Sequence, residues 1–191
     1  QIKPRLKGRC FLVRYADDFV MGFEHEQDAK RVLAVLHRRF GRFGLELHAE
    51  KTRIVPFQRP PNGGERDRRN SQSFDFLGFT HHWDKSKKGY WVVRKKTASD
   101  RLRRSLKVLN QWCRLHRHDR IEDQQTILNQ KLRGHYAYYG VTGNFYSLWR
   151  YYRGVCRYWH KWLRRRDRQA HHLDYDWFQR VVLDNYPLSY P

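Results

Sequence analysis

Two adjacent aspartates, Asp17 and Asp18, are the side chains in this sequence best suited to chemistry. Apolar residues surround them at 10–13 and 19–23, which predicts a strand, a tight turn and a second strand with both acids at the tip. Neighbouring carboxylates repel each other, so a bound cation stabilises the pair. Mg²⁺ prefers one or two carboxylates plus phosphate oxygens, and two such ions can activate a 3′-hydroxyl and neutralise a departing pyrophosphate. The hairpin is therefore expected to support nucleotidyl transfer.

The same dipeptide also has a simpler interpretation. Asp favours turns because its side chain hydrogen-bonds to nearby backbone groups, so many Asp-Asp pairs are only solvated turns. Two features favour metal binding here, namely the bulky apolar residues on both sides and the charge of the whole chain.

The chain carries a large excess of positive charge. Forty Lys and Arg against nineteen Asp and Glu give a net charge of +21, and 16% of the residues are aromatic. Self-repulsion of this size indicates a polyanionic partner, and aromatic residues among the basic ones suit base stacking. A membrane surface is the rival polyanion, but no segment is long and apolar enough to span a bilayer and no signal-peptide pattern is present. We expect nucleic acid as the partner, no membrane, and a cytoplasmic location.

The cysteines and histidines do not indicate a metal centre. Cys10, Cys113 and Cys156 are far apart, and no Cys-x-x-Cys pair is present, so we expect reduced core residues and neither a disulfide framework nor structural zinc. The adjacent His81 and His82 are expected at the surface.

The segment after the Asp-Asp hairpin combines a helix with short strands. Apolar spacing predicts a helix over 26–40, closed by glycines, then strands over 45–47 and 54–57 around a turn at 48–52. Lys51 lies in that turn, where its ammonium can donate a proton to departing pyrophosphate. A solvated turn lysine is the simpler explanation of the same residue.

A second hairpin is expected further along. A strand over 74–83 is followed by a turn at 85–89 and a returning strand over 90–93. Gly78 falls inside the first strand, where it permits close approach by another backbone, although a plain β-bulge explains it equally well.

Helices are expected beyond Lys95. Residues 97–100 resemble a capping box for the first helix, Asn144 can cap the third, and a weaker fourth covers 174–185. The predicted apolar stripes of the first three are Leu102, Leu106, Leu109 and Cys113; Leu128, Leu132, Tyr136 and Tyr139; and Leu148, Tyr152, Val155, Trp159 and Trp162.

The third of these helices also carries a basic face. Its members lie opposite the apolar stripe, at steps of three and four: Arg150, Arg153, Arg157, Lys161 and Arg164. Charged faces are usually solvated and mixed in sign, but residues 144–166 contain no acid, which favours contacts to phosphates.

The fold class expected from these patterns is α+β. Residues 1–95 are expected to form an antiparallel sheet with one covering helix, and residues 96–191 a helical bundle.

Four segments, in this order, resemble the reverse transcriptase–maturases encoded by group II introns. They are the Phe-Leu-Val-Arg-Tyr-Ala-Asp-Asp-Phe run at 11–19, the Gly-Leu-Glu-Leu-His-Ala-Glu-Lys-Thr run at 44–52, the Phe-Asp-Phe-Leu-Gly-Phe run at 74–79, and the Lys-Leu-Arg-Gly-His-Tyr-Ala-Tyr-Tyr-Gly run at 131–140. They resemble, respectively, the catalytic motif of the polymerase palm, the motif after it, the primer grip and the thumb or maturase domain. The resemblance covers nearly the whole chain.

The resemblance implies an RNA-directed DNA polymerase that extends a primer 3′-hydroxyl by two-metal catalysis and assists intron splicing. Asp17 and Asp18 would bind two Mg²⁺ ions, and Lys51 would be the proton donor. Its partners would be an RNA template, intron RNA, a DNA primer or target DNA, and deoxynucleoside triphosphates. The primer grip would be Phe76, Leu77, Gly78 and Phe79, and nucleic acid would contact Arg133, Arg150, Arg153, Arg157, Lys161 and Arg164.

The sequence departs from this family at its N-terminus. Members carry a third metal-binding aspartate and basic fingers before the Asp-Asp motif, whereas only a short lead precedes Tyr15 here. We therefore expect the C-terminal part of a larger polymerase, partnered by the missing fingers and palm portion and poorly active or inactive in DNA synthesis on its own. Two alternatives stay open, a noncatalytic RNA-binding maturase fragment and a reverse transcriptase recruited to a CRISPR-type system.

Overall fold

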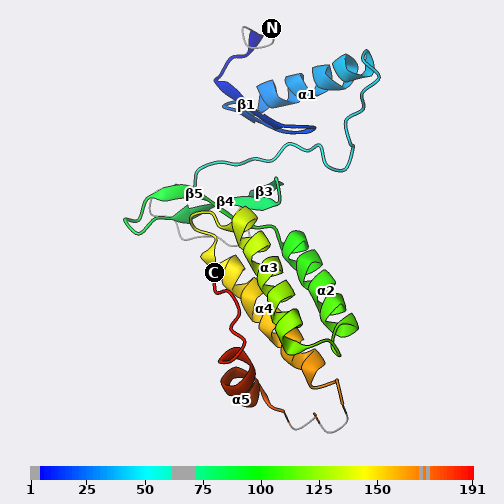
Figure 1. Ribbon diagram of the computed structural model, residues 1–191. Helices are drawn as coiled ribbons and strands as arrows, with labels where there is room; N and C mark the ends of the chain where they lie inside the picture. The colour runs from blue at the N-terminus through cyan, green and yellow to red at the C-terminus, as the bar shows by residue number, and fades with distance from the viewer. Residues whose placement is uncertain (1–4, 62–71, 168–169, 171–172) are drawn as a thin grey trace. The chain divides into compact units, whose positions relative to one another are not determined.

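The computed structural model describes residues 5–61, 72–167, 170 and 173–191 (Figure 1). The chain divides into two compact units, Gln1–Leu77 with His81–Val93, and Gly78–Thr80 with Arg94–Pro191. The described residues form two small antiparallel sheets and several helices, so the α+β class is confirmed. No helix in the described ranges is both long and apolar enough to cross a membrane.

The first unit begins with a tight hairpin and a helix. Strand β1 (Cys10–Tyr15) pairs with β2 (Asp18–Phe23), and Tyr15 lies opposite Asp18, so Ala16 and Asp17 alone form the turn. Helix α1 (Glu26–Gly41) follows, as predicted, and Gly44, three residues after its end, takes a left-handed backbone with φ of 66°. The N–H of Leu45 then donates to the carbonyl of Phe40 at 3.0 Å and closes the last turn.

Helix α1 packs against the hairpin through its apolar side. The ring of Phe19 meets that of Phe40 edge-on at 6.3 Å, and Val32 is buried. At the other end, the buried carboxylate of Asp28 accepts the backbone N–H groups of Lys7 and Gly8 at 3.0 and 3.1 Å. These contacts fix the chain entering β1 to the first turn of α1.

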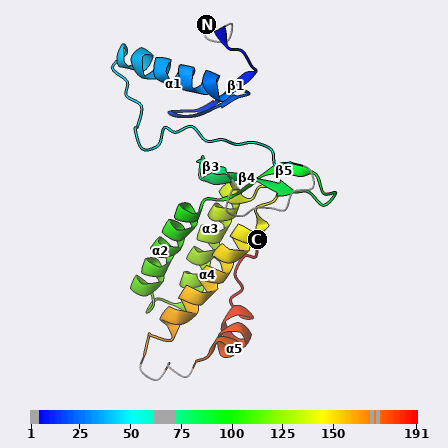
Figure 2. The same cartoon turned by 180° about the vertical axis from the view of Figure 1, so that it is seen from behind.

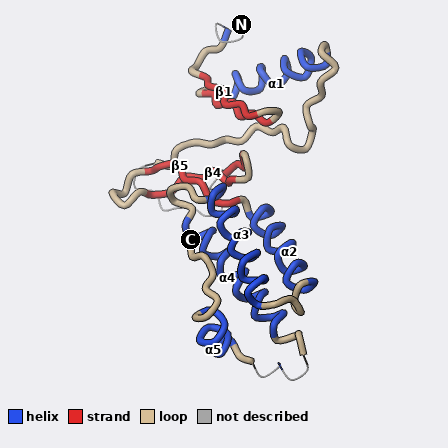
Figure 3. Tube along the Cα trace, viewed as in Figure 1, coloured by secondary structure: helices blue, strands red, loops and turns tan. Residues whose placement is uncertain are grey.

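The prediction of strands over 45–47 and 54–57 is wrong. Figure 3 draws residues 42–61 as loop throughout, although the turn forms, with Thr52 N–H donating to the His48 carbonyl at 2.9 Å. A strand needs a paired neighbour for its backbone groups, and the described chain offers none to these apolar residues. Leu45 accordingly stays 59% exposed.

The second sheet contains one more turn than predicted. Its strands are β3 (Ser73–Phe76), β4 (Phe79–Lys85) and β5 (Trp91–Thr97), in sequence order. Leu77 and Gly78 both have positive φ, 49° and 77°, as the tight two-residue hairpin turn of type I′ requires. Gly78 therefore lies in a turn between strands and not inside one, which corrects the prediction.

The histidines of β4 also differ from their predicted exposure. His82 is buried, and the His81 ring stacks on Phe74 with 4.9 Å between centroids. The expectation that both histidines lie at the surface is therefore wrong for His82, while His81 is partly buried beside Phe74.

The second unit is mainly a helical bundle. Helices α2 (Ser99–Leu115), α3 (Ile121–Tyr139) and α4 (Phe145–Leu163) lie side by side in both Figure 1 and Figure 2. A short helix α5 (Tyr175–Trp177) continues into a π-helical turn, η3 (Phe178–Leu183), close to the predicted fourth helix. The core residues shared by these elements include Leu109, Leu128, Leu132, Val155, Trp159, Phe178 and Val182.

The cysteines of this bundle are core residues, as predicted. Cys113 and Cys156 are free and buried, and burial raises the pKa of the Cys113 thiol to about 12 and that of Cys156 to about 11. Both thiols are therefore protonated and unreactive at neutral pH.

The bundle holds together at one end through Asn144. Its Oδ1 accepts the Thr97 N–H at 2.9 Å, while its Nδ2 donates to Thr97 Oγ1 at 2.9 Å and to the Tyr139 carbonyl at 2.8 Å. Asn144 stands at the N-cap of α4, as predicted, but its side chain makes no capping bond. The capping box predicted over 97–100 is wrong, because Thr97 ends β5 and its hydroxyl accepts from Asn144.

Asn144→Ala should destabilise the second unit. It leaves the Thr97 N–H and the Tyr139 carbonyl without these partners, at a cost of about 3 kcal/mol for buried groups. Urea denaturation followed by circular dichroism measures the loss, and Asn144→Asp, which keeps the acceptor for Thr97 but buries a carboxylate beside the Tyr139 carbonyl, should lose at least as much. A loss below about 1 kcal/mol for the alanine variant would contradict this role.

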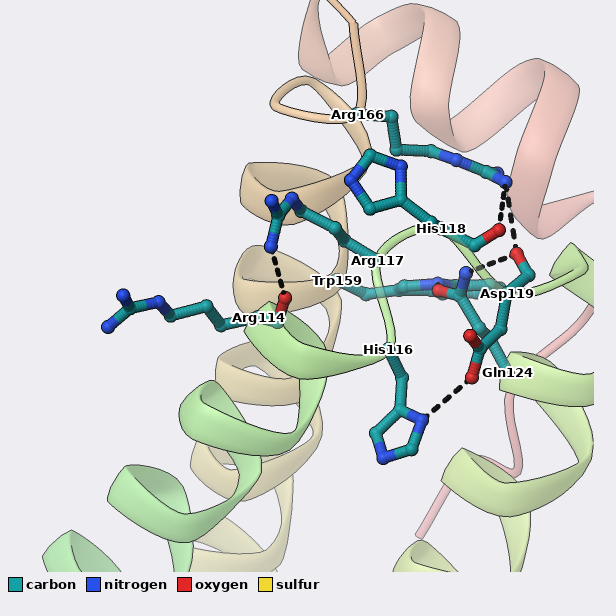
Figure 4. Close-up of polar contacts among 8 residues, drawn as sticks. All are labelled: Arg114, His116, Arg117, His118, Asp119, Gln124, Trp159 and Arg166. Carbon is teal, nitrogen blue, oxygen red and sulfur yellow. Dashed lines mark hydrogen bonds and ion pairs between the residues drawn. The ribbon is translucent and has the colours of Figure 1, made fainter.

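The opposite end of the bundle is closed by polar contacts around the turn between α2 and α3 (Figure 4). Arg166 Nη2 donates to the carbonyls of His118 and Asp119 at 3.2 and 3.0 Å. Gln124 Nε2 also donates to the Asp119 carbonyl at 2.8 Å, and its Oε1 accepts from Trp159 Nε1 in the core at 2.8 Å. The turn is thereby joined both to the end of α4 and to the bundle interior.

Candidate active-site hairpin and nucleic-acid interface

Asp17 and Asp18 lie at the exposed tip of the β1–β2 hairpin. Asp17 is the second turn residue, and Asp18 is the first residue of β2. Both side chains are exposed, and within the described residues neither forms an ion pair with Lys, Arg or His. The adjacent carboxylates predicted from the sequence are therefore open to solvent and form no ion pair in the described part of the chain.

The turn itself has a strained backbone. Ala16 has φ of 49°, in the left-handed region that residues with a Cβ rarely adopt. Arg14 Nε donates to the Ala16 carbonyl at 2.8 Å, which braces the turn from the preceding strand. Farther down the hairpin, the Phe11 ring lies over Gly22, where an added Cβ would be 2.1 Å from it. The two strands are thus fixed in register beneath the acids.

The carboxylates of Asp17 and Asp18 could bind a hard divalent cation whose remaining ligands come from another molecule. No group of three or more His, Cys, Asp or Glu side chains is gathered among the residues that the structure describes. Two carboxylates complemented by phosphate oxygens are a usual Mg²⁺ environment. The arrangement suits a metal ion shared with a nucleotide better than a metal ion held by protein ligands alone.

Lys51, the predicted proton donor, is exposed in the turn between α1 and β3. The N–H of Lys51 donates to the His48 carbonyl at 3.2 Å, so the turn is ordered by its own backbone. Its catalytic role stays a prediction.

The predicted primer-grip residues span the β3–β4 turn. Phe76 ends β3, Leu77 and Gly78 form the turn, and Phe79 begins β4. Within the second unit, the Phe79 ring stacks on Tyr138 at 5.9 Å and meets Tyr139 edge-on at 5.3 Å.

Gly78 is also approached closely by α3. The Tyr139 hydroxyl would lie 3.1 Å from a Cβ added at Gly78, whose carbonyl accepts the Ala98 N–H at 2.9 Å. The close approach that the sequence suggested for Gly78 is therefore made by a tyrosine side chain, and contact with a primer stays a prediction.

The predicted basic face of α4 divides into two parts. Arg150, Arg153 and Arg157 are exposed, whereas Lys161 and Arg164 are partly buried. Lys161 Nζ lies 5.3 Å from the centroid of the Trp162 ring. Arg133 is exposed on α3.

The apolar face of α4 is rotated slightly from its predicted position. Tyr151 and Leu163 are buried, while Tyr152 and Trp162, assigned to the stripe, are only partly buried. Tyr146 and Trp149, which are not among the predicted site residues, line a surface groove with the arginines. Their signal was present, since Tyr146, Trp149 and Arg153 recur at helical spacing on one face.

A buried histidine near the C-terminal end of α3 makes this unit sensitive to acid. His135 stacks on Tyr151 at 3.8 Å, and its Nε2 has no hydrogen-bond partner in the described part of the chain. Burial lowers the pKa of His135 to about 4.

Acidification should therefore destabilise the second unit. Because the folded-state pKa of His135 lies below its ordinary value of 6.5, its contribution to stability is present above pH 6.5 and lost as pH falls toward 4. Denaturant unfolding between pH 7 and 5 measures the loss, and His135→Phe, which keeps the stack, should flatten this dependence. An unchanged pH profile in His135→Phe would contradict the assignment.

Comparison with known protein families gives one match, over the first part of the chain. Residues 1–81 match the family model for the reverse transcriptase (RNA-dependent DNA polymerase) domain. The match includes the Asp-Asp hairpin, α1, Lys51 and the predicted primer-grip turn. It supports a polymerase of the reverse transcriptase type in general, with an RNA template, a primer and nucleotides as its substrates. No curated protein matches the chain, and no solved structure does.

Proposed function

We propose that this chain supplies the Asp-Asp hairpin and the nucleic-acid-binding thumb of a reverse transcriptase of the group II intron type. The observation that supports this most is the position of Asp17 and Asp18 at a braced two-residue turn, exposed and without an ion pair among the described residues, inside a segment that matches the reverse transcriptase family. The resemblance of residues 131–140 to the maturase thumb motif supports the intron type.

The residues have separate roles in this proposal. Asp17 and Asp18 hold Mg²⁺, which when bound neutralises phosphate charge and promotes deprotonation of the primer hydroxyl. Lys51 donates a proton to the departing pyrophosphate. The β3–β4 turn supports the primer end, and the arginines of α4 hold nucleic acid through its phosphates.

The proposal also includes a separate fingers and palm portion and a cytoplasmic location for the complete enzyme. Because the described residues gather only two acids at the hairpin, we propose that a third carboxylate comes from a fingers and palm portion outside this chain. The complete enzyme would act in the cytoplasm on intron RNA and on a DNA primer or target.

The experiment is Mg²⁺-dependent extension of a DNA primer on an RNA template. It compares the chain alone with the chain combined with a fingers and palm polypeptide. We expect extension only in the combination, and extension by the chain alone would overturn the need for a third carboxylate. A combination that binds RNA but never extends a primer would instead support the noncatalytic maturase alternative.

A further inference from the structure

A surface groove on the second unit lies between α4 and α2. It has a volume of about 300 Å³ and is lined by Leu106, Tyr146, Trp149, Arg150, Arg153 and Arg157, among others. All its residues belong to the second unit, so its shape depends only on the packing of two helices within that unit.

A glycine sets the depth of the groove. The end of the Leu106 side chain fills the space beside Gly154, so a side chain at this position of α4 would require Leu106 to move. The floor is therefore apolar and recessed beneath the larger side chains on either side of it.

Aromatic rings and guanidinium groups form the rim. Tyr146 is 67% exposed, and its ring lies nearly parallel to that of Trp149, with 5.9 Å between centroids and 28° between planes. The Arg153 guanidinium lies 4.8 Å from the Trp149 ring centroid, a cation–π distance. A flat ligand placed on this rim would meet aromatic faces and a delocalised cation together.

The charge of the groove is positive and uncompensated. No described carboxylate lines it, and none forms an ion pair with Arg150, Arg153 or Arg157. These three arginines span two turns of α4, about 10 Å along its axis. A chain of phosphates running along α4 would satisfy all three.

We propose that this groove binds unpaired RNA, with a base stacked on the Tyr146 and Trp149 rings and the flanking phosphates on the three arginines. A base inside a duplex is already covered on both faces, so a duplex would use the arginines but not the rings. An acidic peptide would also use only the arginines. The choice of RNA over DNA rests on the proposed function, in which RNA is the template and the intron ligand.

The experiment measures binding of a fluorescent single-stranded RNA and of a duplex with the same sequence, by anisotropy, in the whole chain. Tyr146→Ala and Trp149→Ala should each weaken single-strand binding about 10-fold while leaving duplex binding unchanged. Tyr90→Ala, at a tyrosine of similar exposure in the first unit, is the matched control and should change neither. Tyr146 is largely exposed, so its variant should fold even if Trp149→Ala does not.

A second set of variants distinguishes RNA binding in the groove from general electrostatic attraction to the basic chain. Replacing Arg150, Arg153 and Arg157 with glutamine should reduce the salt dependence of single-strand binding, by about 0.7 in logarithmic slope for each phosphate that the protein no longer neutralises. The control replaces Arg38, Arg39 and Arg42 of the first unit, which removes the same charge. Equal reductions in the two triple variants would overturn the groove as a site.

Two further outcomes decide the ligand. Equal weakening of single-strand and duplex binding by Tyr146→Ala would overturn base stacking, and tighter Trp149-dependent binding of single-stranded DNA than of RNA would overturn the assignment to RNA. Because no polymerisation is measured, a chain that fails in primer extension can still show the groove's preference for unpaired RNA. Failure of the proposed function and failure of the groove are therefore distinguishable.

Discussion

Asp17→Asn combined with Asp18→Asn is expected to lower primer extension by about 1000-fold or more in the assembled polymerase. Asparagine keeps the size and turn preference of aspartate but removes the negative charge that binds Mg²⁺. Loss of metal-based charge stabilisation is worth several kcal/mol in the transition state, and each 1.36 kcal/mol is a factor of ten in rate. Single-turnover extension at saturating nucleotide measures the chemical step directly.

RNA affinity should be unchanged or slightly higher in the same variant, because two negative charges are removed from a protein that binds phosphates. Mn²⁺ can replace Mg²⁺ as a probe, and its paramagnetic broadening of the hairpin NMR signals should disappear. The matched control is Asp123→Asn with Asp176→Asn, which changes the net charge equally but lies in the second unit. Undiminished primer extension by the Asp17→Asn, Asp18→Asn variant would contradict the assignment of these residues as catalytic.

Trp159→Ala is expected to be the most destabilising single substitution in the second unit, by about 4 kcal/mol. Trp159 is fully buried, its ring meets Phe178 edge-on at 5.6 Å, and its Nε1 donates to Gln124 Oε1 at 2.8 Å. Truncation removes the packed ring and also leaves the buried Gln124 oxygen without its donor. Thermal and urea unfolding, followed by circular dichroism at 222 nm, measure the loss.

Trp159→Phe separates the two contributions. It keeps most of the apolar volume but no N–H, so it should cost about 1–3 kcal/mol, mainly for the unsatisfied Gln124. If both variants unfold like the parent protein, the bundle core does not depend on this contact. If the two variants lose equal stability, the hydrogen bond accounts for the whole effect and the ring packing for none.

The helices could be predicted because their buried apolar residues recur every three or four positions. The spacing of Leu128 and Leu132, for example, places both in the core, where they are fully buried. Asn144 shows the limit of such patterns. Its position at the start of α4 was predictable, but its side chain binds Thr97, 47 residues earlier in the chain, and local sequence carries no signal for that partner.

The strands were predicted less well, since a strand exists only if another segment pairs with it. Residues 45–47 and 54–57 have strand-like composition but no partner in the described chain. The Leu77-Gly78 turn was missed because Leu at a positive φ is unfavourable, and an apolar residue before glycine predicts a continuing strand.

Sequence predicts those parts of the candidate site whose residues are adjacent in the chain. It does not predict the parts that form only when helices pack against each other. Asp17 and Asp18 are adjacent in sequence, so their position at one tip follows from the hairpin alone. The helical spacing of Tyr146, Trp149 and Arg153 places them on one face of α4, but the groove that this face forms with Leu106 depends on contact between α2 and α4 and has no local signal.

The two-residue turn at Ala16 and Asp17 also restricts how the length of this segment can change. Side chains alternate faces along a strand, so a length change between Tyr15 and Asp18 that shifts the pairing of β2 by one residue would reverse which side chains face α1. Phe19 would then point away from Phe40, and Val20 would take its place against α1. A substitution at the tip leaves this pairing in place, whereas an inserted or deleted residue preserves the supporting strand only if a different turn type absorbs it.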